Sequence, residues 1–410
     1  MVWDTVRTVL KMGAASLGFA QVATVAGLLV VDKRRKRKDA HKPFPSSEPI
    51  ELPAGEDQVT VYTKGRDLYT DMIAAIDAAE HTVLLETYIW KGDRVGHRFK
   101  RALTAAVERG VEVYVVYDVF ANLVVAPRFF RFDPRIHVLR HYPWTGVRGP
   151  ILWRAPGLNH RKVLVVDGDT AFVGGYNIGS LYSSRWRDTH MRIRGAAASD
   201  LENAFVDYWN QSRRKHHRTL PQPENRPWDS PIKVTRNVPS VGVYPIRYMY
   251  LEAIDRARDH IYLTHAYLIP DDDLTFALVE AADRGVDVRI IVPAESNHII
   301  ADWLSRGYYK QLLSRGVRLF LYQNSMVHAK TATIDGQWST IGTANLDSLS
   351  LLGNYEVNVE VLDADIAAEM ERIFAMDSGN SVELTLEEWE RRPLAMKASE
   401  AILTPLRPLL

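Results

Sequence analysis

The sequence contains no cysteine among its 410 residues. Disulfide bonds, a thiol nucleophile and thiolate metal ligands are therefore excluded, whereas the redox compartment stays open because a chain without cysteine suits either side of a membrane. An excess of one charge is also absent, since 51 Lys and Arg balance 50 Asp and Glu to a formal net charge of +1. Any preference for an anionic partner must then come from a local patch of cations.

Long uncharged stretches are scarce, and the one that stands out lies near the N-terminus. The 20 residues from Met12 to Val31 carry no charge, which is enough for a helix to cross a hydrocarbon core of about 30 Å. An unbroken basic run follows, from Lys33 to Lys38, whereas a cleaved signal peptide carries its charge before the apolar stretch. By the positive-inside rule we predict a single-pass anchor in the cell membrane with the body of the chain on the cytoplasmic side. A buried or peripheral helix is the alternative.

Prolines mark the boundaries of two large units. A segment rich in Pro and Ser follows the basic run, so we assign residues 1–50 to the membrane anchor, its basic flank and a linker. A second proline-rich segment divides the rest into a first domain at 51–220, an interdomain linker at 221–240, and a second domain with a C-terminal tail at 241–410. Each domain is long enough to form a core of its own.

A basic cluster, residues 213–218, comes just before the interdomain linker. It ends a predicted helix that contains Phe205 and Trp209, and cations at the end of a helix complement its dipole. A patch that binds lipid phosphates is the alternative interpretation of the same residues.

The apolar pattern indicates helices alternating with strands. Leu68 and Met72 fall on one face of a helix, and the β-branched and aliphatic run 82–89 is typical of a strand. A second helix ends at Gly110, and another apolar strand, 111–117, follows it. The second half repeats this scheme. We therefore predict two tandem α/β domains related by a pseudo-twofold axis, each with a mainly parallel sheet flanked by helices.

One constellation of polar residues occurs twice, at a constant separation of 168 residues. The first copy consists of His160, Lys162, Asp167, Gly174, Asn177 and Asp188. The second copy consists of His328, Lys330, Asp335, Gly342, Asn345 and Glu356. A lone His-x-Lys has no meaning, but six positions repeated in register indicate a duplicated domain whose two copies build one site.

The pattern His-x-Lys-x4-Asp followed by Gly-x-x-Asn resembles the signature of the phospholipase D superfamily, and both copies carry it in full. Within that superfamily the flanking segments 186–190, 284–288 and 354–358 are most similar to bacterial cardiolipin synthases, and the resemblance covers roughly residues 55–392. It implies that Asp188 and Glu356 each orient the histidine of their own half. The sequence departs from the family at one position of the second motif, where Leu349 replaces an arginine.

Alternation along a strand explains the spacing of each motif. Residues two apart on a strand share a face, so His160 and Lys162 point the same way, as do His328 and Lys330. If the two halves pack about a pseudo-twofold axis, two imidazoles and two ammonium groups converge on one pocket. We interpret this pocket as a phosphate site with a nucleophile on one side and a proton donor on the other.

Each group in this pocket has a chemical role. One neutral imidazole attacks the phosphorus and forms a phosphohistidine, while the other histidine protonates the leaving alkoxide and later deprotonates the acceptor. The sequence does not distinguish the two histidines, and the resemblance favours His160 as the nucleophile. The expected phosphate-binding and charge-stabilising groups are Lys162, Lys330, Asn177 and Asn345. Asp167 and Asp335 belong to the catalytic motif, and we expect them to support the site rather than to touch substrate.

Metal binding is the competing interpretation, because His, Asp and Glu side chains ligate zinc or manganese. Lysines inside the pocket would repel a divalent cation, and they neutralise a phosphate without one. We therefore expect no metal and no cofactor.

The resemblance implies a membrane-anchored phosphatidyltransferase that converts two phosphatidylglycerols into cardiolipin and glycerol. A phospholipase D that uses water or another alcohol as acceptor is the nearest alternative. A phosphodiesterase acting on nucleic acid shares the chemistry but is disfavoured by the anchor, and a non-catalytic lipid-binding protein is disfavoured by two intact motifs. The expected partners are the membrane and an anionic phospholipid. The sequence does not predict an oligomeric state.

Overall fold

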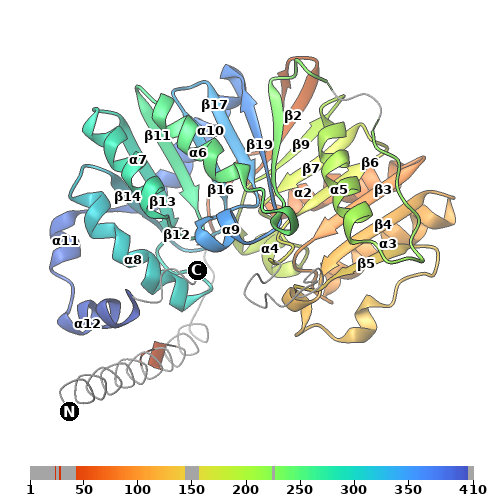
Figure 1. Cartoon of the computed structure of the whole chain (residues 1–410), viewed down its shortest axis with the longest axis horizontal. Helices are drawn as coiled ribbons and strands as arrows, with labels where there is room; N and C mark the ends of the chain where they lie inside the picture. Colours follow the sequence, from red (N-terminus) through yellow and green to blue (C-terminus); the bar gives the residue numbers. More distant parts are fainter. Residues whose placement is uncertain (1–23, 25–26, 29–42, 144–156, 224–226, 405–410) are drawn as a thin grey trace, which may run out of the picture.

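The computed structural model describes Thr24, Gly27, Leu28 and residues 43–143, 157–223 and 227–404. Most of the predicted anchor, 12–31, and the whole basic run, 33–38, lie outside the described residues. Within the part that is described, no helix is both long and apolar enough to cross a bilayer. Figure 1 shows two sheets side by side, with the sheet of the first half on the right and that of the second half on the left.

The first half forms an eight-stranded sheet of order β1-β2-β9-β7-β6-β3-β4-β5. Its strands are β1 (Ile50–Ala54), β2 (Asp57–Tyr62), β3 (Thr82–Thr87), β4 (Glu112–Asp118), β5 (His137–His141), β6 (Val163–Val166), β7 (Thr170–Gly174) and β9 (His190–Arg194). The helices are α2 (Gly65–Ala78), α3 (Arg94–Glu108), α4 (Ser180–Ser184) and α5 (Ala198–Ser212). Helices α2 and α3 cover one face of the sheet and α5 covers the other.

The second half repeats this arrangement in the order β10-β19-β17-β16-β11-β13-β14-β20. Its strands are β10 (Ile232–Asn237), β11 (His260–His265), β13 (Asp287–Pro293), β14 (Arg318–Tyr322), β16 (Lys330–Ile334), β17 (Trp338–Gly342), β19 (Glu356–Leu362) and β20 (Ser381–Leu384). The helices are α6 (Pro245–Arg256), α7 (Asp272–Asp283), α8 (Ile299–Leu313), α9 (Ser348–Leu352), α10 (Ala364–Gly379), α11 (Leu386–Glu390) and α12 (Leu394–Leu403). Seven strands match seven of the first sheet in order, and the edge strands β1 and β20 break the symmetry.

The prediction of a mainly parallel sheet was wrong. Only β3, β4 and β5 run parallel to one another, as do β11, β13 and β14, and every other strand pair in the two sheets is antiparallel. For β6 and β7 the cause is a tight turn, where Asp167 and Gly168 adopt positive φ of 51° and 74°. Such a short connection reverses the chain, whereas parallel neighbours require a long crossover.

The elements predicted for the first half are confirmed with small shifts of their ends. Helix α2 buries Leu68 and Met72, and α3 buries Phe99 and Leu103 against β3 and β4. The segment 221–240, which we predicted to be an interdomain linker, contains β10, the edge strand of the second sheet. Four of its prolines, from Pro221 to Pro231, precede the strand and Pro239 follows it, so the linker prediction extended too far.

The two halves share one hydrophobic core. Val173 and Met191 of the first sheet pack in the same cluster as Ile341 and Val357 of the second. A buried ion pair also joins them, because Arg187 Nη2 lies 2.7 Å from Asp377 Oδ2 on α10 and both side chains are 1% exposed. Removing one partner of such a pair leaves an uncompensated buried charge, which is strongly destabilising. The packing therefore fixes the position of one half against the other, as a site shared between them requires.

Candidate active site

The residues that lead into each motif leave their own sheet and bond to the opposite half. His160 N donates to Tyr355 O at 3.0 Å, and His328 N donates to Arg187 O at a comparable position on the other side. In the second case a short strand, β15 (Met326–Val327), pairs with β8 (Trp186–Arg187) of the first half. The predicted strand placement was therefore only approximate, since both histidines precede β6 and β16, whereas Lys330 opens β16. This backbone pairing with the opposite half brings the two motifs together at the junction of the halves.

Each histidine bonds to the carboxylate of the opposite half. His160 Nδ1 lies 3.0 Å from both Glu356 oxygens, and His328 Nδ1 lies 2.7 Å from Asp188 Oδ2. The expectation that each carboxylate orients the histidine of its own half is therefore wrong. The strand pairing across the junction explains the difference, because it carries each histidine past its own sheet.

These bonds determine the tautomer of both rings. An ionised carboxylate only accepts hydrogen bonds, so Nδ1 of each imidazole carries a proton and Nε2 of the neutral ring keeps its lone pair. Both rings are almost buried, since His160 is 8% and His328 5% exposed. Each also contacts an aromatic ring, with Tyr88 4.6 Å from His160 and Trp186 5.0 Å from His328 between ring centroids. The rings are thus held with their free nitrogens available for chemistry.

The two carboxylates differ in the residue that lies beside them. Thr343 Oγ1 donates to Glu356 Oε2, whereas the matching position in the first half is Gly175. A Cβ atom there would lie 2.0 Å from Asp188 Oδ1, so only glycine leaves room for that carboxylate. Both copies of the repeat therefore keep a carboxylate beside a histidine, while the residue next to that carboxylate changes from glycine in the first copy to threonine in the second.

The two lysines lie in the same buried pocket. Lys162 Nζ donates to His160 O at 2.6 Å and sits 5.2 Å from the centre of the Tyr88 ring. Lys330 Nζ donates to His328 O and lies 2.9 Å from His328 Nδ1. Because that nitrogen already carries a proton toward Asp188, the Lys330 contact brings two donors together. An anion that drew the ammonium group away would relieve this contact between two donors.

Burial dominates the electrostatics of the pocket. It lowers the pKa of Lys162 to about 7 and that of Lys330 to about 8, although Glu356 and Asp188 oppose the change. Burial also lowers the pKa of His328, and the charges of Lys330, Lys162 and His160 lower it further. The groups of both halves therefore interact with one another. Burial disfavours holding all of these cations at once, and the charge of a phosphate anion would compensate them.

The two motif asparagines are buried beside the site but are already engaged. Asn177 Oδ1 accepts a hydrogen bond from Ile89 N at 3.1 Å. Asn345 Nδ2 donates to Ser350 Oγ at 3.4 Å, while its Oδ1 is buried and has no hydrogen-bond partner among the described residues. Both side chains thus support the loops around the pocket, and their binding of phosphate stays a prediction.

The two motif aspartates lie at the far ends of β6 and β16. Asp167 accepts hydrogen bonds from the backbone N–H groups of Glu80, His81 and Thr82 at 2.7 to 2.8 Å. Asp335 accepts from the equivalent amides of residues 258–260. They tie the start of β3 and β11 to the hairpin turns, so the structure does not bring them to the histidines.

Sequence reasoning missed a buried polar cluster behind His160. Asn159 Nδ2 donates to Glu86 Oε1 at 2.6 Å, and Asn159 N donates to Asp118 Oδ2 at 3.0 Å. Arg161 is 1% exposed and donates to three backbone carbonyls, including Glu356 O. A buried strand that contains a carboxylate, as at Glu86, was the signal available in the sequence.

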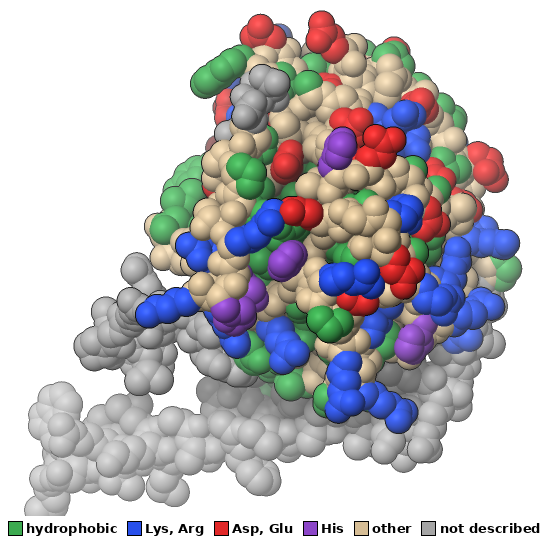
Figure 2. Space-filling model, turned by 90° about the vertical axis from the view of Figure 1, so that its right-hand side faces the viewer, with side chains coloured by type: hydrophobic (Ala, Val, Ile, Leu, Met, Phe, Trp, Pro, Cys, Tyr) green, Lys and Arg blue, Asp and Glu red, His purple; other side chains and the backbone are tan. Residues whose placement is uncertain are grey.

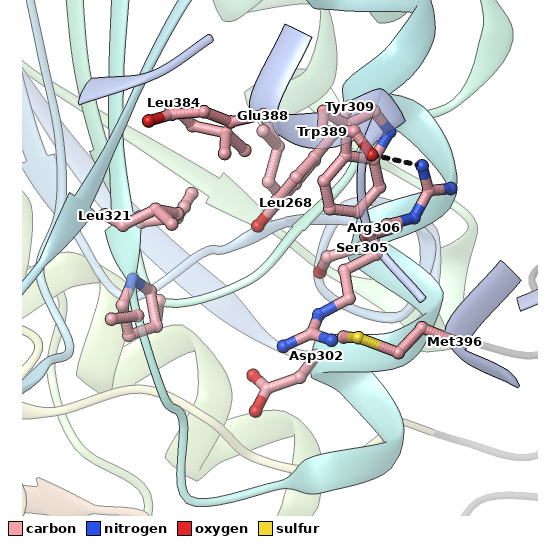
Figure 3. A pocket seen from close by; sticks show the side chains of 15 residues that line it. Leu268, Asp302, Ser305, Arg306, Tyr309, Leu321, Leu384, Glu388, Trp389 and Met396 are labelled. Atoms are coloured by element: carbon pink, nitrogen blue, oxygen red, sulfur yellow. Dashed lines mark hydrogen bonds between the residues drawn. The ribbon is translucent and has the colours of Figure 1, made fainter. Parts of the chain in front are cut away.

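A cavity of about 190 Å³ in the second half, drawn in Figure 3, is separate from the histidines. Trp389 and Tyr309 form part of its wall, and Arg392 lies 3.8 Å above the Trp389 ring. Arg392 Nη1 also donates to Trp389 O at 2.7 Å, the dashed line in Figure 3. None of the motif residues lines this cavity, which lies where α11 packs against α8. Across the described ranges, no group of three or more His, Asp or Glu side chains is placed to hold a metal ion.

Comparisons with known proteins agree with the geometry. The family described as "Cardiolipin synthase, PLD-like domain" matches residues 72–209 and 250–378. The major cardiolipin synthase of Bacillus subtilis is 33% identical over 369 residues, which is 87% of this chain and 76% of that protein. Cardiolipin synthase 1 of Staphylococcus aureus is 32% identical over 365 residues, covering 86% and 74%. A phosphatidylserine synthase structure from Haemophilus influenzae shares the fold, with a TM-score of 0.68, 14% identity and coverage of 92% and 100%.

The exchange of carboxylates between halves predicts which histidine responds to which substitution. In Asp188→Asn the Nδ1 proton of His328 loses its ionised acceptor, so the ¹⁵N signals of that ring should shift toward a mixture of tautomers while those of His160 stay unchanged. Glu356→Gln should give the reverse. Nuclear magnetic resonance of ¹⁵N-histidine-labelled protein measures both, with His160→Ala and His328→Ala to assign the signals. A shift of His160 in Asp188→Asn would restore the pairing within each half.

Proposed function

Because this chain belongs to the cardiolipin synthase family of phospholipase D-like proteins, we propose that its shared site joins two phosphatidylglycerols through a phosphohistidine. It is a phospholipase D-type phosphatidyltransferase, and cardiolipin synthesis is its function. The observation that supports the detailed mechanism is the convergence of two histidines and two lysines, each histidine bonded to a carboxylate of the opposite half.

In the first step His160 Nε2 attacks the phosphorus of phosphatidylglycerol. The P–N bond forms while the bond from phosphorus to the glycerol oxygen breaks, and His328 in its protonated form donates a proton to that oxygen. Glu356 holds the attacking ring and partly neutralises the charge that develops on it, as a triad carboxylate does. Free glycerol leaves with the proton.

In the second step a second phosphatidylglycerol replaces the glycerol. Its terminal hydroxyl attacks the phosphorus, the P–N bond breaks, and His328 accepts the hydroxyl proton. Cardiolipin leaves, and both histidines return to their starting protonation states. Asp188, 2.7 Å from His328 Nδ1, stabilises the protonated ring at the point in the cycle where it must donate.

Lys162 and Lys330 neutralise the nonbridging oxygens throughout. Their lowered pKa values, about 7 and 8, follow from burial. A phosphodiester anion between them favours the charged ammonium forms, so substrate binding and lysine protonation support each other. This arrangement supplies the positive charge that many phosphoryl-transfer sites obtain from a divalent cation.

Product analysis tests the assignment of acceptor and donor. Purified enzyme given phosphatidylglycerol alone should release cardiolipin and glycerol in near-equal amounts with little phosphatidic acid, and the reaction should survive EDTA. Mainly phosphatidic acid, with no cardiolipin at any lipid density, would replace the synthase by a lipid hydrolase.

His160→Ala and His328→Ala should each lower turnover by several orders of magnitude, and the double variant should be scarcely worse, as for groups that act as a unit.

We also propose that the chain is anchored in the cell membrane by residues 12–31, with both domains in the cytoplasm. The basic run 33–38 supports this orientation. Leu28, near the end of this segment, is 8% exposed and packs in one cluster with Ile299 and Leu304 of α8 and Leu403 of α12, so at this residue the segment lies against the second half. An anchored enzyme meets lipid acceptors at high local concentration, which favours transfer to lipid over transfer to water.

The proposed orientation predicts protection of the C-terminus. A reporter fused after Leu410 should resist protease added outside intact cells and should be digested once the cells are opened. A reporter placed before Met1 should be digested in intact cells, which controls for access of the protease. Digestion of the C-terminal reporter in intact cells would invert the orientation.

A further inference from the structure

A groove of about 760 Å³ lies in the first half between the start of α3 and the connection from β4 to β5. We call it the α3 groove. Its polar wall contains Lys91, Lys100, Arg128 and Arg131, and its apolar wall includes Phe129 and Leu181. The catalytic residues do not line it, and the steps proposed above do not use it.

The charges of the α3 groove are not balanced within the protein. Four basic side chains line the groove with one carboxylate, Asp93, whose oxygens accept the backbone N–H groups of Val95, Gly96 and Ser180 at 2.7 to 3.1 Å. Lys100 Nζ is held by two backbone carbonyls, those of Phe129 and Arg131.

Three of these cations lack a protein anion among the residues that the structure describes. Lys91, Arg128 and Arg131 form no ion pair within the described part of the chain. Unpaired cations that share a groove repel one another unless an anion from outside compensates them. The groove is therefore complementary to an anionic ligand.

Apolar side chains project from the connection that forms one wall of the groove, and Val124 among them lines it. Phe120 is 52%, Leu123 67% and Val124 84% exposed, all within one connection after β4. Scattered exposed apolar residues are ordinary, but a cluster beside unpaired cations is the combination found at membrane interfaces. Figure 2 shows the outer face of the first half, where Lys and Arg side chains predominate in the lower part and acidic side chains lie mainly above.

One short segment, residues 88–91, connects the α3 groove to the catalytic pocket. Lys91 follows Tyr88, whose ring contacts His160, by three residues. Asn122 fixes the β4–β5 connection to this segment, since its Oδ1 accepts from Trp90 N and its Nδ2 donates to Tyr88 O, both at 2.8 Å. In Figure 1 this connection lies on the lower side of the molecule, as do α8 and α12 of the second half, against which Leu28 packs. A surface that touches this side of the molecule is thus close to both the β4–β5 connection and helices α8 and α12.

We propose that the α3 groove binds the phosphate of an anionic phospholipid in the bilayer, distinct from the lipid that reacts, and seats the first domain on an anionic membrane surface. The cations contact the phosphate, and Phe120, Leu123 and Val124 enter the boundary between headgroups and acyl chains. The proposal rests on the proposed function only for the presence of a phospholipid surface, and it requires no turnover.

The test uses a fluorophore at the edge of the groove. Because the chain has no cysteine, Val124→Cys gives a single position for an environment-sensitive NBD label, and His160→Ala stops the reaction. The full chain is reconstituted into vesicles of phosphatidylcholine with increasing fractions of phosphatidylglycerol. We expect the emission to rise and shift to the blue as the fraction increases.

Removing the three unpaired cations should weaken this response. The variant Lys91→Gln, Arg128→Gln, Arg131→Gln should lower the affinity for vesicles that contain phosphatidylglycerol by roughly a hundredfold, because each of three basic residues near an anionic surface contributes about fivefold. The control variant Lys233→Gln, Arg256→Gln, Arg258→Gln removes one lysine and two arginines around a separate cavity in the second half, and it should respond as the parent does. Unchanged thermal unfolding of both variants shows that each is folded.

Three outcomes would overturn the proposal. These are an equal response in vesicles of pure phosphatidylcholine, an unchanged response in the groove variant, and an equal loss in the control variant. A response suppressed by millimolar glycerol phosphate would assign the groove to a soluble phosphate ester instead. Since the label is read in the inactive His160→Ala protein, failure here leaves the product analysis untouched, and a failed product analysis leaves the groove untouched.

Discussion

The hydrogen bonds from His160 to Glu356 and from His328 to Asp188 connect the two halves at their reactive centre. Neither half holds its own histidine in the tautomer that the chemistry needs, so each half is incomplete alone. The shared hydrophobic core and the buried pair of Arg187 with Asp377 keep the halves in the one relative position that satisfies both bonds. The fold, the tautomers and the reaction thus depend on the same interface.

Burial of the two lysines explains why the site suits a phosphodiester. Burial lowers their pKa values to about 7 and 8, because a low-dielectric environment disfavours two neighbouring cations. A phosphate between them removes this penalty, and it also draws Lys330 away from the Nδ1 proton of His328. Binding energy is therefore greatest when an anion lies between the two imidazoles, where the chemistry takes place.

Much of the site could be predicted from the sequence, because the duplication places the same residue types at the same spacing. The pairing of carboxylates with histidines could not, since it depends on strands β8 and β15 that are two residues long and carry no periodic signal. The mixed sheet was missed for a related reason. Helices α2 and α3 are strongly patterned and indicate parallel neighbours, whereas the hairpin turn at Asp167 gives a weak local signal. The unpaired cations of the α3 groove are dispersed over 41 residues from Lys91 to Arg131, so only the folded chain brings them together.

Trapping the covalent intermediate is the most direct test of a site shared between the halves. The enzyme is mixed with phosphatidylglycerol, quenched with base or denaturant that preserves phosphohistidine, digested and analysed by mass spectrometry. We predict a phosphatidyl group on His160, which should be absent from His160→Ala and from Lys162→Ala, Lys330→Ala. An adduct on His328 instead would exchange the roles of the two histidines within the same site. An active enzyme with no adduct on either histidine would contradict the account.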